Sequence, residues 1–291
     1  MNMKKWMLKL GFVFVLALVL TACGGNNGDS ANNGNAANNE NTATNENGAN
    51  SGDDVQGFPH ITGIEPGAGV MNAAEQAVTE DEEWVVVTGW TPHWKFAAFD
   101  LKYLDDPQGI FGGEETINTI VRQGLEEDHP EAYQVLDNFY WETSDMESIM
   151  LDIYENDTDP REAAQTWIDN NRDKVDGWIE GVDTVDGESL DLVYVTWDSE
   201  IASTNMIAIV LEEIGYDVEI TPVDNNPMWQ AVADGSHDAM VAAWLPLTHE
   251  SQYAEFQDQV VDLGPNLEGA KIGLVVPTYV TIDSIEEITA Q

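Results

Sequence analysis

Short apolar runs rich in β-branched residues recur along this chain, and amphipathic stretches separate them. The runs at residues 84–87, 192–195, 240–244 and 272–276 have the length and content of buried strands. Between two of them, residues 203–214 place their apolar side chains on one helical face. Strands that alternate with helices predict an α/β fold, and the repeated strand-to-helix step predicts mainly parallel pairing.

A tryptophan stands at or just after the end of three expected strands: Trp90, Trp197 and Trp244. Ligands of open α/β sheets bind beyond the carboxyl ends of the strands. One such indole alone is more often part of a core, but three at equivalent strand ends predict an aromatic cage. The negative faces of the rings attract a cation that has no N–H to donate, such as a quaternary ammonium.

Two further segments suit an anionic group. The turn at residues 65–70 contains two glycines before a predicted helix, so the backbone N–H groups of Gly69 and Val70 can point at an oxyanion. His249, five residues after Trp244, adds a side chain that can donate a hydrogen bond. Each signal is weak alone, since a plain turn and a packing or surface histidine are commoner.

The charge of the chain excludes one large class of partner. Its 10 Lys and Arg residues face 54 Asp and Glu residues, which gives a formal net charge of −44. A protein that binds nucleic acid needs a basic surface for the phosphates, so we expect no nucleic-acid partner. The 10 Trp, 8 Tyr and 8 Phe residues supply ample apolar surface, so the chain is not a disordered acidic tail.

Residues 1–22 have the pattern of a signal peptide, with lysines followed by an apolar run at 10–20. The sequence Leu-Thr-Ala-Cys that ends at Cys23 resembles the lipobox of bacterial lipoproteins, which implies cleavage before Cys23 and a lipid on its thiol. The alternative is an ordinary secretory signal peptide. Residues 23–57 then form a lipidated cysteine and an Asn- and Gly-rich tether.

Six sequence blocks resemble the glycine betaine binding lipoproteins of osmoprotectant ABC importers, over residues 61–291. The blocks are 89–94, 100–107, 197–205, 227–229, 243–246 and 269–277. The block at 65–69 precedes the block at 197–205, which is similar to the order in the circularly permuted members.

This resemblance implies a two-lobed periplasmic-binding-protein fold of the type II-like kind, with the ligand in a cleft between the lobes. Residues 58–185 would form lobe I, 186–278 lobe II, and 279–291 a return segment toward lobe I. The protein would capture glycine betaine outside the cytoplasm and deliver it to an ABC permease and its ATPase. It would have no catalytic residue, metal or cofactor, and would be held at the outer face of the cell membrane by Cys23.

The family's site residues are carried over by position. Its cage tryptophans match the three strand-end tryptophans, and its carboxylate-binding groups match the backbone of Gly69 and Val70 and the ring of His249. One departure concerns the stretch between Thr79 and Trp84, where a strand and a helix of the family are absent. A missing strand and helix would leave their lobe with less core, so we expect that lobe to be weakly stable.

Other functions stay open at this point. The ligand could be another quaternary ammonium compound, such as choline or proline betaine. An extracellular hydrolase could use Asp198, Glu200 and His249 as acid-base groups, although the chain lacks a Gly-x-Ser-x-Gly elbow and a His-Glu-x-x-His motif. A surface-structural protein would show internal repeats, and none is found.

Overall fold

The computed structural model describes residues 84–289, all of which belong to the unit Asp53–Gln291. Within this part of the chain, no helix is long and apolar enough to cross a membrane. The described strands are β1 Val87–Thr91, β2 Leu101–Tyr103, β3 Glu115–Arg122, β4 Ser189–Val195, β5 Asp217–Val223, β6 Ala239–Leu245 and β7 Val260–Pro277. The described helices are α2 Trp94–Ala98, α3 Leu125–Asp128, α4 Pro130–Asn138, α5 Thr143–Asn156, α6 Pro160–Asn170, α7 Arg172–Ile179, α8 Asp198–Glu213, α9 Asn225–Ala233, α10 Glu250–Phe256 and α11 Ile285–Thr289.

The described strands follow the order β1-β7-β3-β6-β4-β5, and β2 also pairs with β7. β4 pairs in parallel with β5 and with β6. The pairs of β3 with β6 and β7, and of β7 with β1 and β2, are antiparallel. The prediction of mainly parallel strands is therefore wrong, because an apolar run indicates a buried strand but not the direction of its neighbours.

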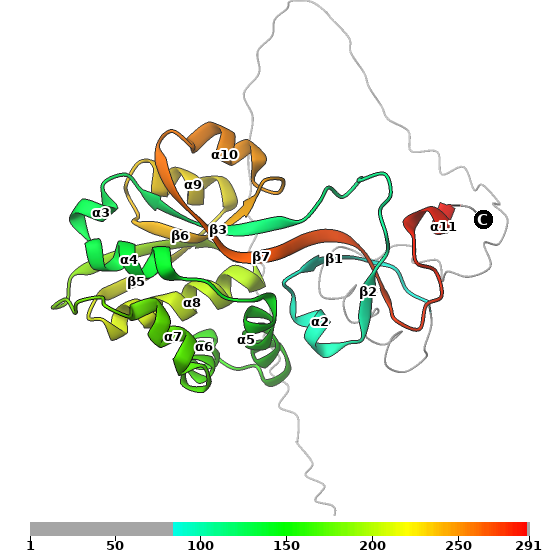
Figure 1. The fold of residues 1–291 in the computed structure, drawn as a ribbon, viewed down its shortest axis with the longest axis horizontal. Helices are drawn as coiled ribbons and strands as arrows, with labels where there is room; N and C mark the ends of the chain where they lie inside the picture. The colour runs from blue at the N-terminus through cyan, green and yellow to red at the C-terminus, as the bar shows by residue number, and fades with distance from the viewer. Residues whose placement is uncertain (1–83, 290–291) are drawn as a thin grey trace, which may run out of the picture. The chain divides into compact units, whose positions relative to one another are not determined.

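The strand β7 belongs to two sets of pairs. Its residues 260–270 pair with β3, and its residues 271–277 pair with β1 and β2. We call residues 115–270, with β3 to β6 and α3 to α10, the large region. Residues 84–104 and 271–289, with β1, α2, β2 and α11, form the small region. Figure 1 shows β7 running from the one into the other.

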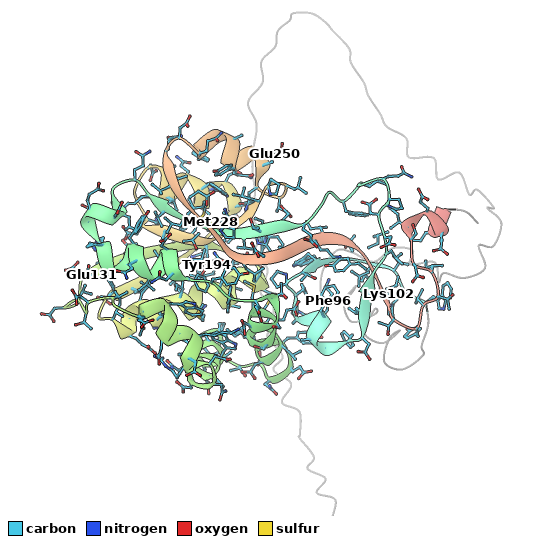
Figure 2. The ribbon with its side chains drawn as sticks, in the orientation of Figure 1. Phe96, Lys102, Glu131, Tyr194, Met228 and Glu250 are labelled. Carbon is cyan, nitrogen blue, oxygen red and sulfur yellow. The ribbon has the colours of Figure 1, made fainter. Side chains whose placement is uncertain are left out.

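Helices cover both faces of the sheet in the large region. Neighbouring residues of β4 show why, since Leu192 packs in the cluster of α4 to α8, and Val193 packs with Met228 of α9. Successive side chains of a strand point to opposite faces. Figure 2 shows Met228 against the sheet, whereas Glu250, at the start of α10, is exposed.

The helix α8 is buried on most of its sides, because β4, β5 and β6 lie against it together with α5 and α6. It begins at Asp198, five residues before the amphipathic stretch predicted at 203–214. Gly215 follows it with a φ of 108°. A side chain there would meet the carbonyl oxygen of Val185 at 2.1 Å, so only glycine fits this turn.

The small region has a modest core of its own. Its buried apolar cluster, among the described residues, consists of Leu104, Val276, Val280, Ile282 and Ile285. Trp94 of α2 packs outward from this region, with its ring stacked on Tyr154 of α5 at 3.6 Å between centroids. The small region is thus held by β7 and by this contact between α2 and α5.

The strand pairs favour a division of the described chain near residues 104–115 and at 270/271. The lobe boundary predicted at 185/186 stays a prediction; that point lies between α7 and β4, inside the large region. The helix α6 before that point packs against α8 after it. Apolar patterning could not locate this division, since β7 continues across it without a break.

Candidate functional site

Trp244 is the most buried of the three predicted cage residues, with 3% of its surface exposed. It lies in β6, whose seven residues are all buried because β3 and β4 flank the strand and helices cover both faces. The indole Nε1 donates a hydrogen bond of 2.7 Å to Oε1 of Glu200. The orientation of this ring is therefore fixed by the fold of the large region.

Trp197 lies two residues after β4, at the N-cap of α8. Its backbone is extended there, with φ −92° and ψ 154°, so the chain turns from strand to helix at this point. Its indole stacks on the ring of His249, with 5.6 Å between centroids and 14° between planes. The ring remains 36% exposed.

Trp90 lies in β1 of the small region, opposite Ile272 of β7, and is 38% exposed. The ammonium of Lys95 lies 4.5 Å from the centroid of its ring, a cation–π contact. The ring of His93 lies edge-on to it at 4.7 Å. Burial lowers the pKa of Lys95 to about 8. Burial, followed by the charge of Lys95, lowers the pKa of His93 to about 3, so His93 is neutral at pH 7.

The structure brings the three tryptophans together. Trp90, Trp197 and Trp244 line one pocket of about 230 Å³, together with Thr248 and Ile272. The large region supplies Trp197, Trp244 and Thr248, and the small region supplies the other two. Among the described residues that line this pocket, none carries a carboxylate. Such a pocket can attract a cation through the ring faces and bury its methyl groups.

His249 lies behind the pocket and does not line it. Its Nδ1 accepts a 2.9 Å hydrogen bond from the backbone N–H of Trp244, so the neutral ring carries its proton on Nε2. That Nε2 is buried and has no hydrogen-bond partner among the described residues. Burial lowers the pKa of His249 to about 4, so at pH 7 the ring is a neutral donor.

The loop between Trp244 and His249 is held by Glu115, a residue that the sequence analysis missed. Its Oε1 accepts hydrogen bonds from the backbone N–H groups of Leu247 and Thr248 at 2.9 and 2.7 Å. Its Oε2 accepts the hydroxyl of Thr248 at 2.7 Å. Glu115 begins β3, and no local sequence signal links it to a loop 130 residues away. These bonds place Thr248 at the pocket.

The acid-base groups considered for a hydrolase are not open to a common site. Glu200 is completely buried and His249 is buried behind Trp197, whereas Asp198 lines a different cavity beside Trp94. Burial raises the pKa of Glu200 to about 7. Among residues 84–289, no cluster of three His, Cys, Asp or Glu side chains is placed to hold a metal.

Four predicted features lie outside the described residues. They are Cys23, Gly69, Val70 and the junction between Thr79 and Trp84, where the resemblance implies that a strand and a helix of the family are absent. Of the six predicted ligand-binding residues, the structure therefore places four, and it brings three of them to one pocket.

Comparison with known proteins decides the family. The model of the substrate-binding domain of ABC-type glycine betaine transport systems matches residues 45–170 and 188–291. The chain belongs to this family. Membership confirms the predicted fold class, an α/β periplasmic-binding-protein fold of the type II-like kind, and the predicted role as the substrate-binding protein of an ABC betaine importer.

Two relatives illustrate the similarity. The glycine betaine/carnitine transport binding protein GbuC of Listeria monocytogenes is 49% identical over 256 residues, which cover 78% of this chain and 85% of that protein. The lactococcal OpuAC, solved in its closed-liganded conformation with glycine betaine, is 50% identical. That match covers 34% of this chain and 39% of the other, with a TM-score of 0.33.

Proposed function

We propose that this protein captures glycine betaine, or a closely related betaine, in the pocket between its large and small regions. The observation that carries the proposal is the convergence of Trp90, Trp197 and Trp244 on one pocket, whose described lining residues include no carboxylate. A trimethylammonium has no N–H to donate, so ring faces suit it better than hydrogen-bond acceptors do. Relatives named for glycine betaine and carnitine binding support this ligand class.

The carboxylate of the ligand would bind at the other end of the pocket. We assign it to the backbone N–H groups of Gly69 and Val70 and to Nε2 of His249. The neutral state and the unpartnered Nε2 of His249 support this role. Because Nε2 is buried in the described structure, its contact with a ligand requires a local rearrangement of the side chains that cover it.

The two regions would act as the two lobes of the binding protein. We place residues 115–270 in one lobe and residues 84–104 and 271–289 in the other, following the strand pairs. Each lobe supplies at least one indole to the pocket, so a bound cation bridges them. Bridging contacts favour the closed arrangement, because only that arrangement offers all the rings at once.

The proposed capture of a betaine implies that the protein delivers this ligand to an importer. The protein would stand outside the cytoplasm, tied to the cell membrane by a lipid on Cys23 and by the tether at 23–57. It would present its ligand to an ABC permease that is driven by an ATPase. The lipobox-like sequence and the family support this placement. The described residues that line the pocket include no acid-base pair.

Calorimetric titration tests the ligand class. We expect the full chain to bind glycine betaine well and choline, which shares the cation but lacks the carboxylate, at least tenfold more weakly, since charge-assisted hydrogen bonds would be lost. Proline betaine should bind comparably to glycine betaine. Equal affinity for choline and glycine betaine would contradict the carboxylate site, and binding of neither would contradict the whole proposal.

A further inference from the structure

A buried carboxyl group is hydrogen-bonded to one of the tryptophans that line the pocket. Glu200 is completely buried, and its Oε1 accepts the 2.7 Å hydrogen bond from the indole of Trp244. Its Oε2 accepts a 2.5 Å hydrogen bond from the hydroxyl of Ser199. The indole of Trp244 therefore contacts Glu200 through its N–H edge and also lines the pocket where the three tryptophans meet.

No cation compensates this carboxyl among the described residues, since none of their ion pairs includes Glu200. Two hydrogen bonds and its place as the third residue of α8 are what stabilise its charge, because helix N-termini favour negative groups. A buried charge without an ion partner is costly. A cation held against the face of that indole would reduce this cost.

We propose that Glu200 is a positioning and specificity residue of the betaine site: it fixes the indole of Trp244 and supplies, through that indole, the negative charge that a quaternary ammonium requires. The inference rests on the proposed function. An N–H···O⁻ hydrogen bond polarises the indole toward a more negative ring face, which strengthens the cation–π contact. When the ligand arrives, the carboxyl O–H of the protonated fraction ionises and its proton passes to the solvent.

The pKa of Glu200, raised by burial to about 7, puts this ionisation within reach of neutral pH. Ser199 and Trp244 lower this pKa by hydrogen bonding, and the charge of Asp198 raises it. A cation in the pocket would lower the pKa further, because opposite charges stabilise each other. Betaine affinity should therefore rise as the pH increases through 7.

Other titratable groups lie near this site. His249 has a pKa of about 4 and stays neutral, and Lys95, beside Trp90, titrates near 8. β6, which packs on α8, carries no titratable residue. The titratable residues on the other elements packed against α8 are Asp145, Glu147, Asp152, Tyr154 and Glu155 of α5, Arg161, Glu162 and Asp169 of α6, Asp191 and Tyr194 of β4, and Asp217 and Glu219 of β5.

The experiment is calorimetric titration of glycine betaine into the full chain between pH 5.5 and 7.5, which stays below the pKa of Lys95. We expect the affinity of the unmodified protein to rise about tenfold over this range, which corresponds to a bound cation lowering the pKa of Glu200 by roughly one to two units. Titrations in two buffers with different ionisation enthalpies should show a proton released on binding near pH 6.5.

Two variants test whether Glu200 causes the pH dependence of betaine affinity. Glu200→Gln keeps an oxygen for the indole N–H but cannot ionise, so its affinity should be independent of pH and about tenfold below that of the unmodified protein at pH 7.5. Ser199→Ala removes a hydrogen bond from the carboxylate, so its affinity profile should shift to higher pH. Trp fluorescence and circular dichroism check that each variant is folded.

The outcomes separate the two proposals. If the unmodified protein binds no betaine, the proposed function fails. If it binds betaine with a flat pH profile and no proton release, Glu200 has no role beyond packing and this inference is wrong. Superimposable profiles for the unmodified protein and Glu200→Gln would also overturn it. Should Glu200→Gln fail to fold, the proton release and the Ser199→Ala shift still decide the question.

Discussion

The tryptophans on the two sides of the pocket differ in how extensively the surrounding structure fixes their positions. Trp244 stands in a fully buried strand of the large region, and its N–H is bound to Glu200. Trp90 stands in β1 of the small region, which pairs with β7 alone among the described strands, and more than a third of its surface is exposed. The large region thus presents a preformed surface, whereas the small region contributes a wall whose position depends on few contacts.

The first test of this contrast is truncation of the indoles. Trp244→Ala should lower the free energy of unfolding by about 3–5 kcal/mol, as expected for a buried aromatic side chain. Trp90→Ala should change it by less than about 1 kcal/mol, because the ring is partly exposed. Both variants, and Trp197→Ala, should weaken betaine binding by about 1–2 kcal/mol or more. Urea unfolding and calorimetry measure the two quantities.

Trp178→Ala is the matched control for those variants. Trp178 is buried in the helical layer of the large region, where it stacks on Trp167 and does not line the pocket. Its loss should destabilise the fold and leave the affinity of the folded protein nearly unchanged. An affinity loss as large as that of the cage variants would mean that the position of the three indoles is not the cause of binding.

Hydrogen exchange of the backbone amides compares the regions directly. Amides that pair β2 with β7 should have opening free energies lower than those that pair β3 with β6 by about 2 kcal/mol or more, because a small cluster resists local unfolding less than an extensive one. Saturating betaine should protect the β2 amides more than the β3 amides. Equal protection in the free protein would show that opening the small region costs as much free energy as opening the large one. It would also contradict the prediction that a lobe without the family's strand and helix is weakly stable.

Lowering the pH should reduce the stability of the folded protein through His93, which lies in the small region. Its neutral ring accepts the N–H of Lys95 at the N-cap of α2, and its pKa is lowered from 6.5 to about 3. The folded state therefore resists protonation, so the stability that His93 contributes is complete above pH 6.5 and is lost as the pH falls toward 3. Between pH 7 and 5 this loss amounts to about 2 kcal/mol.

The variant His93→Asn isolates that loss. Asparagine keeps a cap acceptor but does not titrate. Chemical unfolding at pH 7 and pH 5 should show the unmodified protein losing about 2 kcal/mol more than the variant. Parallel losses in the two proteins would mean that the ring of His93 takes up its proton without cost in the folded state.

The smallest effect is expected at Ile272, which lines the pocket opposite Trp90 on β7. Ile272→Ala should weaken betaine binding by about 0.5–1 kcal/mol, in proportion to the apolar surface that a ligand would cover there. Ile110→Ala is the control, since Ile110 is 67% exposed and does not line the pocket. Calorimetry should show no change for Ile110→Ala, and an equal change would remove Ile272 from the site.

Local sequence predicted the positions of the strands better than their arrangement. The apolar runs at 192–195, 240–244 and 272–276 all fall inside observed strands. The run at 84–87 shares only Val87 with β1. The pairing directions were not predictable, because they depend on contacts between distant segments. The full length of β7 was not predictable either, since polar and Gly-Pro positions at 262–269 interrupt its apolar pattern.

For the site, residues that face the pocket were easier to predict than residues that hold it. The cage tryptophans share a position after an apolar run, which is a local pattern. Neither Glu115 nor Glu200 stands in a local sequence pattern of this kind. Their roles arise because folding buries each carboxyl next to N–H groups from another segment, and neither burial nor that partner is visible in the neighbouring residues.

The continuous strand β7 has a mechanical consequence. Since it passes from the large to the small region without interruption, the two can change their relative orientation only by torsion of an extended ribbon and by movement of the connection at 105–114. At the crossing point the register with β3 shifts beside Gly269, whose φ is 80°, and such irregularities increase local twist. Twisting such a continuous strand away from its resting angle costs conformational energy. After ligand release, that energy would favour a return of the two regions to their starting orientation.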